Sequence, residues 1–142
     1  MEKNLPSADL AQRLREFLQD VKEIAFAYLY GSAAHDPAPY GGDIDIAVYL
    51  KASDTEEYIK KETELTVLLI SRLSTDEIDL RVLNVLPLVL QYNILKEGIL
   101  ILSRDEMERV EFETSVMLRF FELKPYLDEY RMMLSERIKD AQ

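Results

Sequence analysis

The sequence predicts an α/β (α+β) domain: a small mixed sheet flanked by helices, with a long C-terminal helical segment. Three observations predict it. Short apolar runs alternate along the chain with longer segments that have the period of an amphipathic helix. Two of the short runs also alternate apolar and acidic side chains, as strands with one buried face do. An order in which strands alternate with helices favours a sheet with helices packed against it.

The chain has 142 residues, of which 48% are hydrophobic and 31% charged. This size suits one compact domain, so we expect a single domain over residues 1–142. No apolar run reaches the roughly 18 residues that span a bilayer, and the N-terminus (MEKNLPSADL) lacks the apolar stretch of a signal peptide. There is no cysteine, which excludes disulfides and thiolate metal sites. A cytoplasmic protein without membrane association is expected.

The charge of the chain is strongly negative. Lys and Arg number 17 and Asp and Glu number 27, which gives a net charge of −10. Nucleic-acid binders usually present a basic surface that displaces counterions from phosphates, so a polynucleotide substrate is not expected. A basic protein partner would be attracted electrostatically, although acidity also serves solubility alone.

The first elements follow from local patterns. A helix is expected over residues 8–21, with an apolar stripe of Leu10, Leu14, Phe17, Leu18 and Val21. Residues 24–30 (IAFAYLY) form an apolar run that stops at Gly31, which is typical of a buried strand. The prolines and glycines of residues 35–42 (HDPAPYGG) predict a loop.

A second strand is expected over residues 43–50 (DIDIAVYL). Side chains alternate in direction along a strand, so one face takes Ile44, Ile46, Val48 and Leu50, and the other takes Asp43, Asp45, Ala47 and Tyr49. A helix then runs to about Leu73, capped by Ser53 with Glu56 or by Asp54 with Glu57. Its predicted buried residues are Tyr58, Leu65, Leu68 and Leu69.

A third strand is expected over residues 77–83 (EIDLRVL), where Asp79 and Arg81 share a face opposite the apolar residues. Pro87 and Gly98 bracket a further helix, LVLQYNILKE, because proline suits a first turn and glycine a C-terminal stop. A short apolar run covers residues 99–102. From about Arg104 to Ile138 the pattern is helical, and Pro125 should kink or break it. The predicted stripe of that helix is Met107, Val110, Met117 and Phe121.

Three features of the chain point to phosphoryl transfer. Gly31 and Ser32 stand where a strand ends, and there a glycine lets a ligand approach the backbone while N–H groups and a hydroxyl bind phosphate oxygens. Asp43 and Asp45, two residues apart, leave the same face of a strand. Asp79 lies on another strand with the same alternation. If the two strands are neighbours, three carboxylates converge.

A cluster of ionised carboxylates repels itself, so it makes chemical sense when cations are bound. Mg²⁺ prefers oxygen ligands and pairs carboxylates with substrate phosphates. Two such ions can activate an attacking hydroxyl and stabilise a leaving pyrophosphate. Each feature alone is a common turn or surface pattern; it is their combination on one predicted sheet face that predicts a site.

The segments GSAAHDPAPYGGDIDIAV and EIDLRVLN resemble the signature of the DNA polymerase β-like nucleotidyltransferase superfamily, and the short chain resembles its minimal nucleotidyltransferase branch. The resemblance implies that Gly31 and Ser32 bind the triphosphate. It also implies that Asp43, Asp45 and Asp79 bind the metal ions, and that Asp79 orients or deprotonates the acceptor hydroxyl. Many members of this branch are antitoxins of HEPN-domain ribonuclease toxins. The implied reaction transfers AMP from ATP to a tyrosine of that toxin.

Two alternatives remain open at this point. The same catalytic residues would serve a nucleotidyltransferase acting on a small molecule such as an aminoglycoside. A docking inhibitor would neutralise its partner without catalysis. The roles of His35, Arg81, the tyrosines and the C-terminal helix also stay open, since each of these has an ordinary structural interpretation.

Overall fold

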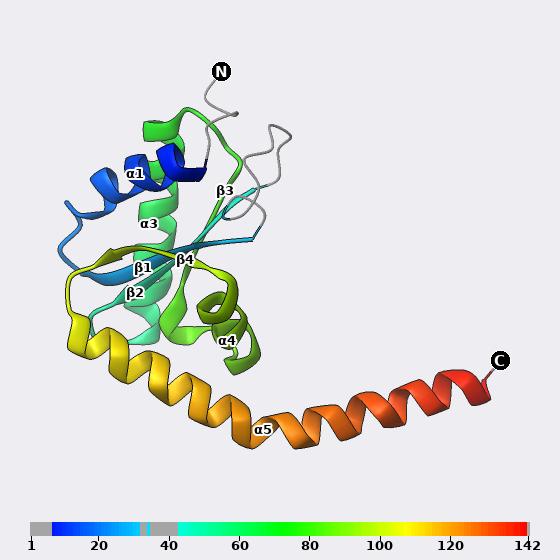
Figure 1. Ribbon diagram of the computed structural model, residues 1–142. Helices are drawn as coiled ribbons and strands as arrows, with labels where there is room; N and C mark the ends of the chain where they lie inside the picture. The colour runs from blue at the N-terminus through cyan, green and yellow to red at the C-terminus, as the bar shows by residue number, and fades with distance from the viewer. Residues whose placement is uncertain (1–6, 32–33, 35–42, 142) are drawn as a thin grey trace.

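The computed structural model describes residues 7–31, 34 and 43–141. Its elements follow the expected order of strands and helices (Figure 1). Helix α1 (Ser7–Leu18) precedes β1 (Ile24–Tyr30) and β2 (Ile44–Leu50). Then come α3 (Thr55–Leu73), β3 (Ile78–Val82), the short 3₁₀ helix η2 (Leu83–Val85), α4 (Leu88–Glu97), β4 (Ile99–Ser103) and α5 (Glu106–Asp140). The predicted α+β class and the long C-terminal helix are confirmed.

The four strands form one mixed sheet in the order β3-β2-β1-β4. Strand β1 pairs antiparallel with both β2 and β4, whereas β2 pairs parallel with β3. The parallel pair is connected through α3, as a parallel connection requires a crossover. This pairing makes β2 and β3, which carry the acidic residues, direct neighbours.

Both faces of the sheet are buried over much of their area. One face packs Leu14, Leu65 and Leu69 of α1 and α3 against β-strand residues such as Ile46 and Val48. The other face has a smaller core under α4 and α5, whose members are Ala25, Phe26, Tyr28, Ala47, Leu83 and Ile94. The predicted alternation of β2 is therefore confirmed. The other face of β2 was predicted only to point away from the first core, and it is also buried at Ala47.

Helix α3 begins at the predicted cap. The Asp54 carboxylate accepts a hydrogen bond from the Glu57 amide at 2.8 Å, and Ser74, with φ 55°, ends the helix in the left-handed region. Tyr58, Leu65 and Leu69 are buried as predicted. The prediction for Leu68 was wrong, because its side chain is 47% exposed. Leu68 and Leu69 lie about 100° apart on a helix, and only one of them can face the sheet.

Helix α4 also has the predicted boundaries. Pro87 is its N-cap residue, and the Gly98 amide donates to the Ile94 carbonyl at its end. A Cβ on Gly98 would lie 2.5 Å from that carbonyl oxygen. Glycine is therefore required here by the close approach of the backbone, which allows the chain to turn directly into β4.

Of the two predictions for α5, a kink or a break at Pro125 and a buried stripe, only the second needs correction. The helix continues through Pro125 without a break, and Figure 1 shows it changing direction in its orange middle part. A proline removes only one intrahelical hydrogen bond, and a 35-residue helix retains the others on both sides. The stripe of Met107, Val110, Met117 and Phe121 is exposed, whereas the buried residue of this helix is Val116. Two apolar stripes run along different faces of this helix. Packing against the rest of the protein buries only one of them, which periodicity alone does not identify.

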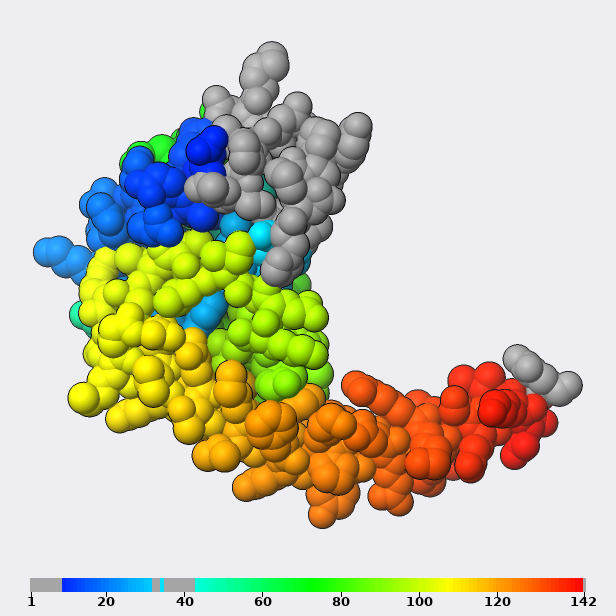
Figure 2. Space-filling view, in the orientation of Figure 1, coloured from blue at the N-terminus to red at the C-terminus, as the bar shows by residue number. Residues whose placement is uncertain are grey.

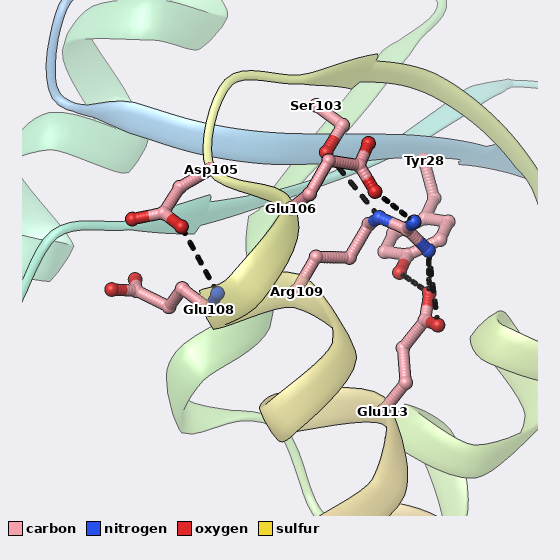
Figure 3. A network of polar contacts seen from close by, with 7 residues as sticks. All are labelled: Tyr28, Ser103, Asp105, Glu106, Glu108, Arg109 and Glu113. Atoms are coloured by element: carbon pink, nitrogen blue, oxygen red, sulfur yellow. Dashed lines mark hydrogen bonds and ion pairs between the residues drawn. The ribbon is translucent and has the colours of Figure 1, made fainter.

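The start of α5 is attached to the sheet by a polar network (Figure 3). Asp105 caps the helix by accepting from the Glu108 amide at 3.0 Å. Arg109 donates to both Glu113 carboxylate oxygens at 3.1 Å and also contacts Glu106. The buried hydroxyl of Tyr28 on β1 donates to the same Glu113 carboxylate. Burial and the neighbouring Glu113 raise the pKa of Tyr28, so this hydroxyl stays protonated and acts as a donor.

We expect Glu113→Ala to lower the free energy of unfolding by about 2–3 kcal/mol, because it leaves a buried hydroxyl and a guanidinium without their acceptor. Urea unfolding monitored by circular dichroism measures this loss. The matched control is Glu111→Ala on an exposed position of the same helix, which should change stability by less than about 0.5 kcal/mol. Equal stability of the two variants would show that the network does not hold α5 to the sheet.

Among the described residues, no helix combines the length and the apolar composition needed to cross a bilayer. Long as it is, α5 carries charged residues throughout its sequence.

Candidate active site

The pairing of the strands brings the side chains of Tyr30, Asp45 and Asp79 into one row, which we call the acidic row. Asp45 on β2 is the register partner of Asp79 on β3, and on its other side it is the partner of Tyr30 on β1. Register partners lie on the same face of a sheet. The row is on the face that also carries Ala47 and Tyr49, beyond the part covered by α4 and α5. The predicted convergence of Asp45 and Asp79 is thus confirmed by the strand pairing.

The electrostatics of this row are those of crowded carboxylates. Partial burial, followed by the charges of Asp79 and Asp43, raises the pKa of Asp45 to about 6. Hydrogen bonding with the Asp79 carboxyl contributes in the same direction, as the register of the two residues on neighbouring strands allows. Asp43 lies just before β2 and is exposed, yet it is near enough for its charge to affect Asp45.

Arg81 is the cation of this face. Its Nε lies 3.3 Å from Asp79 Oδ1, and the hydrogen bond to Asp79 raises the pKa of the guanidinium. Both side chains are substantially exposed, so the pair adds little to stability. Arg81 also lowers the pKa of Asp45, but burial and the charges of Asp79 and Asp43 outweigh this effect.

The raised pKa of Asp45 predicts how stability changes with pH. A carboxyl that is easier to protonate in the folded state stabilises the fold below the unfolded pKa near 4, and this contribution is lost as pH rises through 6. Without divalent metal, we expect Asp45→Asn to be about 1–2 kcal/mol more stable than the wild type at pH 8. The difference should vanish near pH 4. Thermal melts in a chelator at both pH values measure the difference in stability. A variant less stable than the wild type at pH 8 would contradict the claim that the Asp45 carboxylate destabilises the metal-free fold.

Gly31 follows β1 directly and closes one side of the row. Its φ of +71° lies in the left-handed region, and a Cβ at this position would lie 2.3 Å from Asp45 Oδ2. The backbone at Gly31 therefore touches the carboxylate, as a turn that brings a phosphate to the metal site would require. Ser32, the other predicted phosphate-binding residue, lies outside the described residues, as does His35.

The residues present suit a hard divalent cation. Their ligand atoms are all carboxylate oxygens, and a bound cation would offset both the burial and the carboxylate repulsion that raise the pKa of Asp45. Among the described residues, no three acidic or histidine side chains form a ready-made metal-binding group. The arrangement is a neighbouring pair, Asp45 and Asp79, with Asp43 close by.

Tyr30 is a member of the row that the sequence pattern did not single out. Burial and then the charges of Asp45 and Asp79 raise its pKa to about 12, so its hydroxyl is neutral beside the carboxylates. Glu62 reaches the same region from α3 and accepts a hydrogen bond from the Val82 amide at 2.9 Å. Tyr30 directly precedes Gly31, but its position beside Asp45 depends on the register of β1 with β2. The other strand tyrosines, Tyr28 and Tyr49, are packing residues of the second core.

A separate hollow of about 370 Å³ lies toward the other end of β2. Tyr49, Tyr58, Asn84, Gln91, Phe112 and Arg119 are among its lining residues. The polar groups of Asn84 are occupied by hydrogen bonds to the Leu50 backbone and to Tyr58. This hollow contains none of the acidic row and is not the candidate active site.

Comparison with protein families identifies the family of the matched segment. A family model described as "Polymerase beta, Nucleotidyltransferase" matches residues 12–107. The matched segment contains all four strands and the whole acidic row, and it ends just inside α5. A search of curated protein sequences found no match.

Solved structures of similar fold include toxin–antitoxin complexes. A mutant "MntA-HpeT" complex has a chain with TM-score 0.67 and 20% identity, and a toxin–antitoxin complex with AMP-PNP has one with TM-score 0.66 and 22% identity. Each match covers 85% of this chain and 98% of the other. A third structure contains a tri-AMPylated HEPN toxin of Shewanella oneidensis with an MNT antitoxin. Its TM-score is 0.58 at 22% identity, covering 91% and 98%. These similarities establish the fold.

Proposed function

This chain belongs to the polymerase β nucleotidyltransferase family, and from that premise we propose that it transfers AMP from ATP to a tyrosine hydroxyl of a HEPN-domain toxin and thereby acts as an antitoxin. The observation that carries the proposal is the register of Asp45 with Asp79 beside the Gly31 turn. It combines a carboxylate pair for a metal ion with a backbone turn suited to a triphosphate.

The residues of the acidic row and the neighbouring Asp43 have different roles in the reaction. Asp43 and Asp45, with Asp79, would hold two Mg²⁺ ions, which when bound neutralise charge on the triphosphate and on the leaving pyrophosphate. Asp79 is placed to accept the proton of the attacking hydroxyl. The hydroxyl oxygen forms a bond to the α-phosphorus as the bond to the bridging oxygen of the β-phosphate breaks. Pyrophosphate leaves, and the product is an AMP ester of the tyrosine.

Tyr30 and Gly31 would shape the site around this chemistry. The Tyr30 hydroxyl is protonated at neutral pH and lies beside the carboxylates. It can therefore donate a hydrogen bond to an anionic oxygen. Gly31 leaves the space against Asp45 Oδ2 that any side chain would fill.

The comparisons support the choice of substrate and partner. One similar antitoxin-containing complex was solved with AMP-PNP, and another contains a tri-AMPylated HEPN toxin. The net charge of −10 also suits a basic partner such as an RNA-cleaving protein.

The test is transfer of label from α-³²P-ATP, with Mg²⁺, to the HEPN-domain protein of the same genome. We expect label on that protein with pyrophosphate as the co-product, and mass spectrometry to place an AMP on a tyrosine. Label on an aminoglycoside in the absence of any partner would instead favour a small-molecule enzyme. Neutralisation of the toxin by an Asp43→Ala/Asp45→Ala variant would show that binding alone suffices.

A further inference from the structure

The last half of α5 extends away from the rest of the molecule. We call residues 123–140 the arm. Figures 1 and 2 show it projecting from the body in orange and red, with no other described part of the chain along it in this view. None of its side chains is buried, and only Leu123 and Leu127 are half-buried. The arm also lies outside the segment that matches the nucleotidyltransferase family, which ends at residue 107. The shared catalytic fold therefore does not account for it.

One apolar stripe runs from the packed part of α5 into the arm. Its members, spaced alternately four and three residues apart, are Val116, Phe120, Leu123, Leu127, Tyr130 and Leu134. The first two pack on the body: Val116 is fully buried, and Phe120 stacks on Tyr92 of α4 at 3.7 Å between ring centroids. Beyond Phe120 the same face continues without anything to cover it. Tyr130 is 60% exposed and Leu134 37%.

The spacing of this stripe indicates the shape of what covers it. A repeat of seven residues with apolar first and fourth positions is the pattern by which one helix packs along another. The stripe has this pattern within the protein, where Phe120 packs on α4. Its continuation therefore fits a helix of another chain, packed in the same manner.

Charge distinguishes between a second copy and a different partner. The arm carries four basic and four acidic residues and is neutral, so the whole net charge of −10 lies on the rest of the chain. Two copies joined by their arms would bring two strongly acidic bodies together. A basic partner would instead be attracted by the body and would not be repelled by the arm.

We propose that the arm is a docking surface for a helix of a basic protein partner, the HEPN-domain toxin, packed along Leu123, Leu127, Tyr130 and Leu134. In the view of Figure 1 the arm leaves the body below α4 and extends toward the side on which β1 ends and β2 begins. A toxin bound along the arm is thus held on the side of the acidic row. The identity of the partner rests on the proposed function; the position of the surface rests on the stripe.

The test compares two double variants of the full chain. Leu127→Glu/Leu134→Glu places charges in the stripe, and Met132→Glu/Ser135→Glu places the same charges at exposed positions outside the stripe. Calorimetric titration with the HEPN-domain protein should show affinity about 100-fold or more weaker for the first variant. The control should stay within about threefold of the wild type. Circular dichroism should show equal helix content in all three proteins.

Transfer kinetics give a second measurement. The stripe variant should raise the KM for the toxin and keep its kcat, because the arm positions the partner without touching the reacting atoms. Its affinity for AMP-PNP should equal that of the wild type. Unchanged toxin affinity in the stripe variant overturns the proposal. So does sedimentation showing that the wild type alone is a dimer and the stripe variant a monomer, since a second copy would then cover the arm.

Failure of the docking surface and failure of the proposed reaction give different results. If the toxin binds through the stripe but never acquires label, the reaction is wrong and the surface stands. If the stripe variant binds and labels the toxin as well as the wild type does, the surface is wrong and the reaction stands. The Asp45→Asn variant should bind the toxin normally, which separates the two functions in one protein.

Discussion

Asp45→Asn is expected to reduce AMP transfer by about a hundredfold to a thousandfold while leaving the chain folded. An amide has the size of a carboxylate but no charge, and it cannot help to neutralise a divalent cation beside Asp79. The loss of one preorganised charged group at a phosphoryl-transfer site is commonly worth about 3–4 kcal/mol in the barrier. Initial rates of labelled AMP transfer over a range of Mg²⁺ concentrations measure the effect.

The comparison of activity with stability makes this test selective. Because the pKa of Asp45 is raised by burial and by Asp79 and Asp43, the carboxylate destabilises the metal-free fold at neutral pH. The same substitution should therefore remove activity and raise the melting temperature. A matched change, Asp76→Asn on an exposed position before β3, should alter neither. If Asp45→Asn lost activity together with stability, misfolding would explain the result and the catalytic assignment would lose its support.

Gly31→Ala is the second substitution with a large expected effect. The new Cβ would lie 2.3 Å from Asp45 Oδ2, and alanine at φ +71° is itself strained by about 1–2 kcal/mol. Relief of the contact requires the carboxylate or the turn to move by about an ångström, a shift that can reduce a rate by about a hundredfold. We expect transfer to fall by at least that factor, measured well below the melting temperature.

Gly98→Ala is the control for Gly31→Ala. Its Cβ would also approach backbone atoms closely, at 2.5 Å from the Ile94 carbonyl oxygen, so stability should fall. The Gly98 Cβ does not approach a carboxylate of the row. Transfer by the remaining folded protein should therefore change far less than in Gly31→Ala. Equal loss of activity in both variants would mean that the contact between Gly31 and Asp45 has no special role.

The acidic row shows how a destabilising arrangement can be retained within a stable fold. Core residues on both faces of the sheet, including Phe26, Leu29 and Ile46, are fully buried. Their packing holds β1 and β2 in register, including at the end of the strands that carries the acidic row. The partial burial of the Asp45 carboxylate, together with its repulsion by Asp79 and Asp43, costs about 1–2 kcal/mol after allowance for solvent screening, and the two cores offset this cost. Sites that bind a cation commonly carry such a penalty in its absence.

Part of this protein was determined by the sequence alone. The limits of β1, the Asp54 cap of α3 and the bracketing of α4 by Pro87 and Gly98 were predicted and are found. Each depends on neighbours a few residues away: apolar runs, a carboxylate near free amides, and the restricted backbone of proline and glycine. The alternation that placed Asp43 and Asp45 opposite the core of β2 is equally local, because side chains alternate along any strand.

Other features were decided only by the tertiary structure. The sequence does not show that β2 pairs with β3, or that Asp45 lies beside Asp79 and Tyr30. Likewise, the exposure of Leu68 and the buried stripe of α5 through Val116 were not predicted correctly, and the sequence did not decide between a kink and a break at Pro125. The physical reason is common to all of them. Strand order, register and the choice of a helix face are fixed by contacts between residues far apart in sequence, and local periodicity is compatible with several such arrangements.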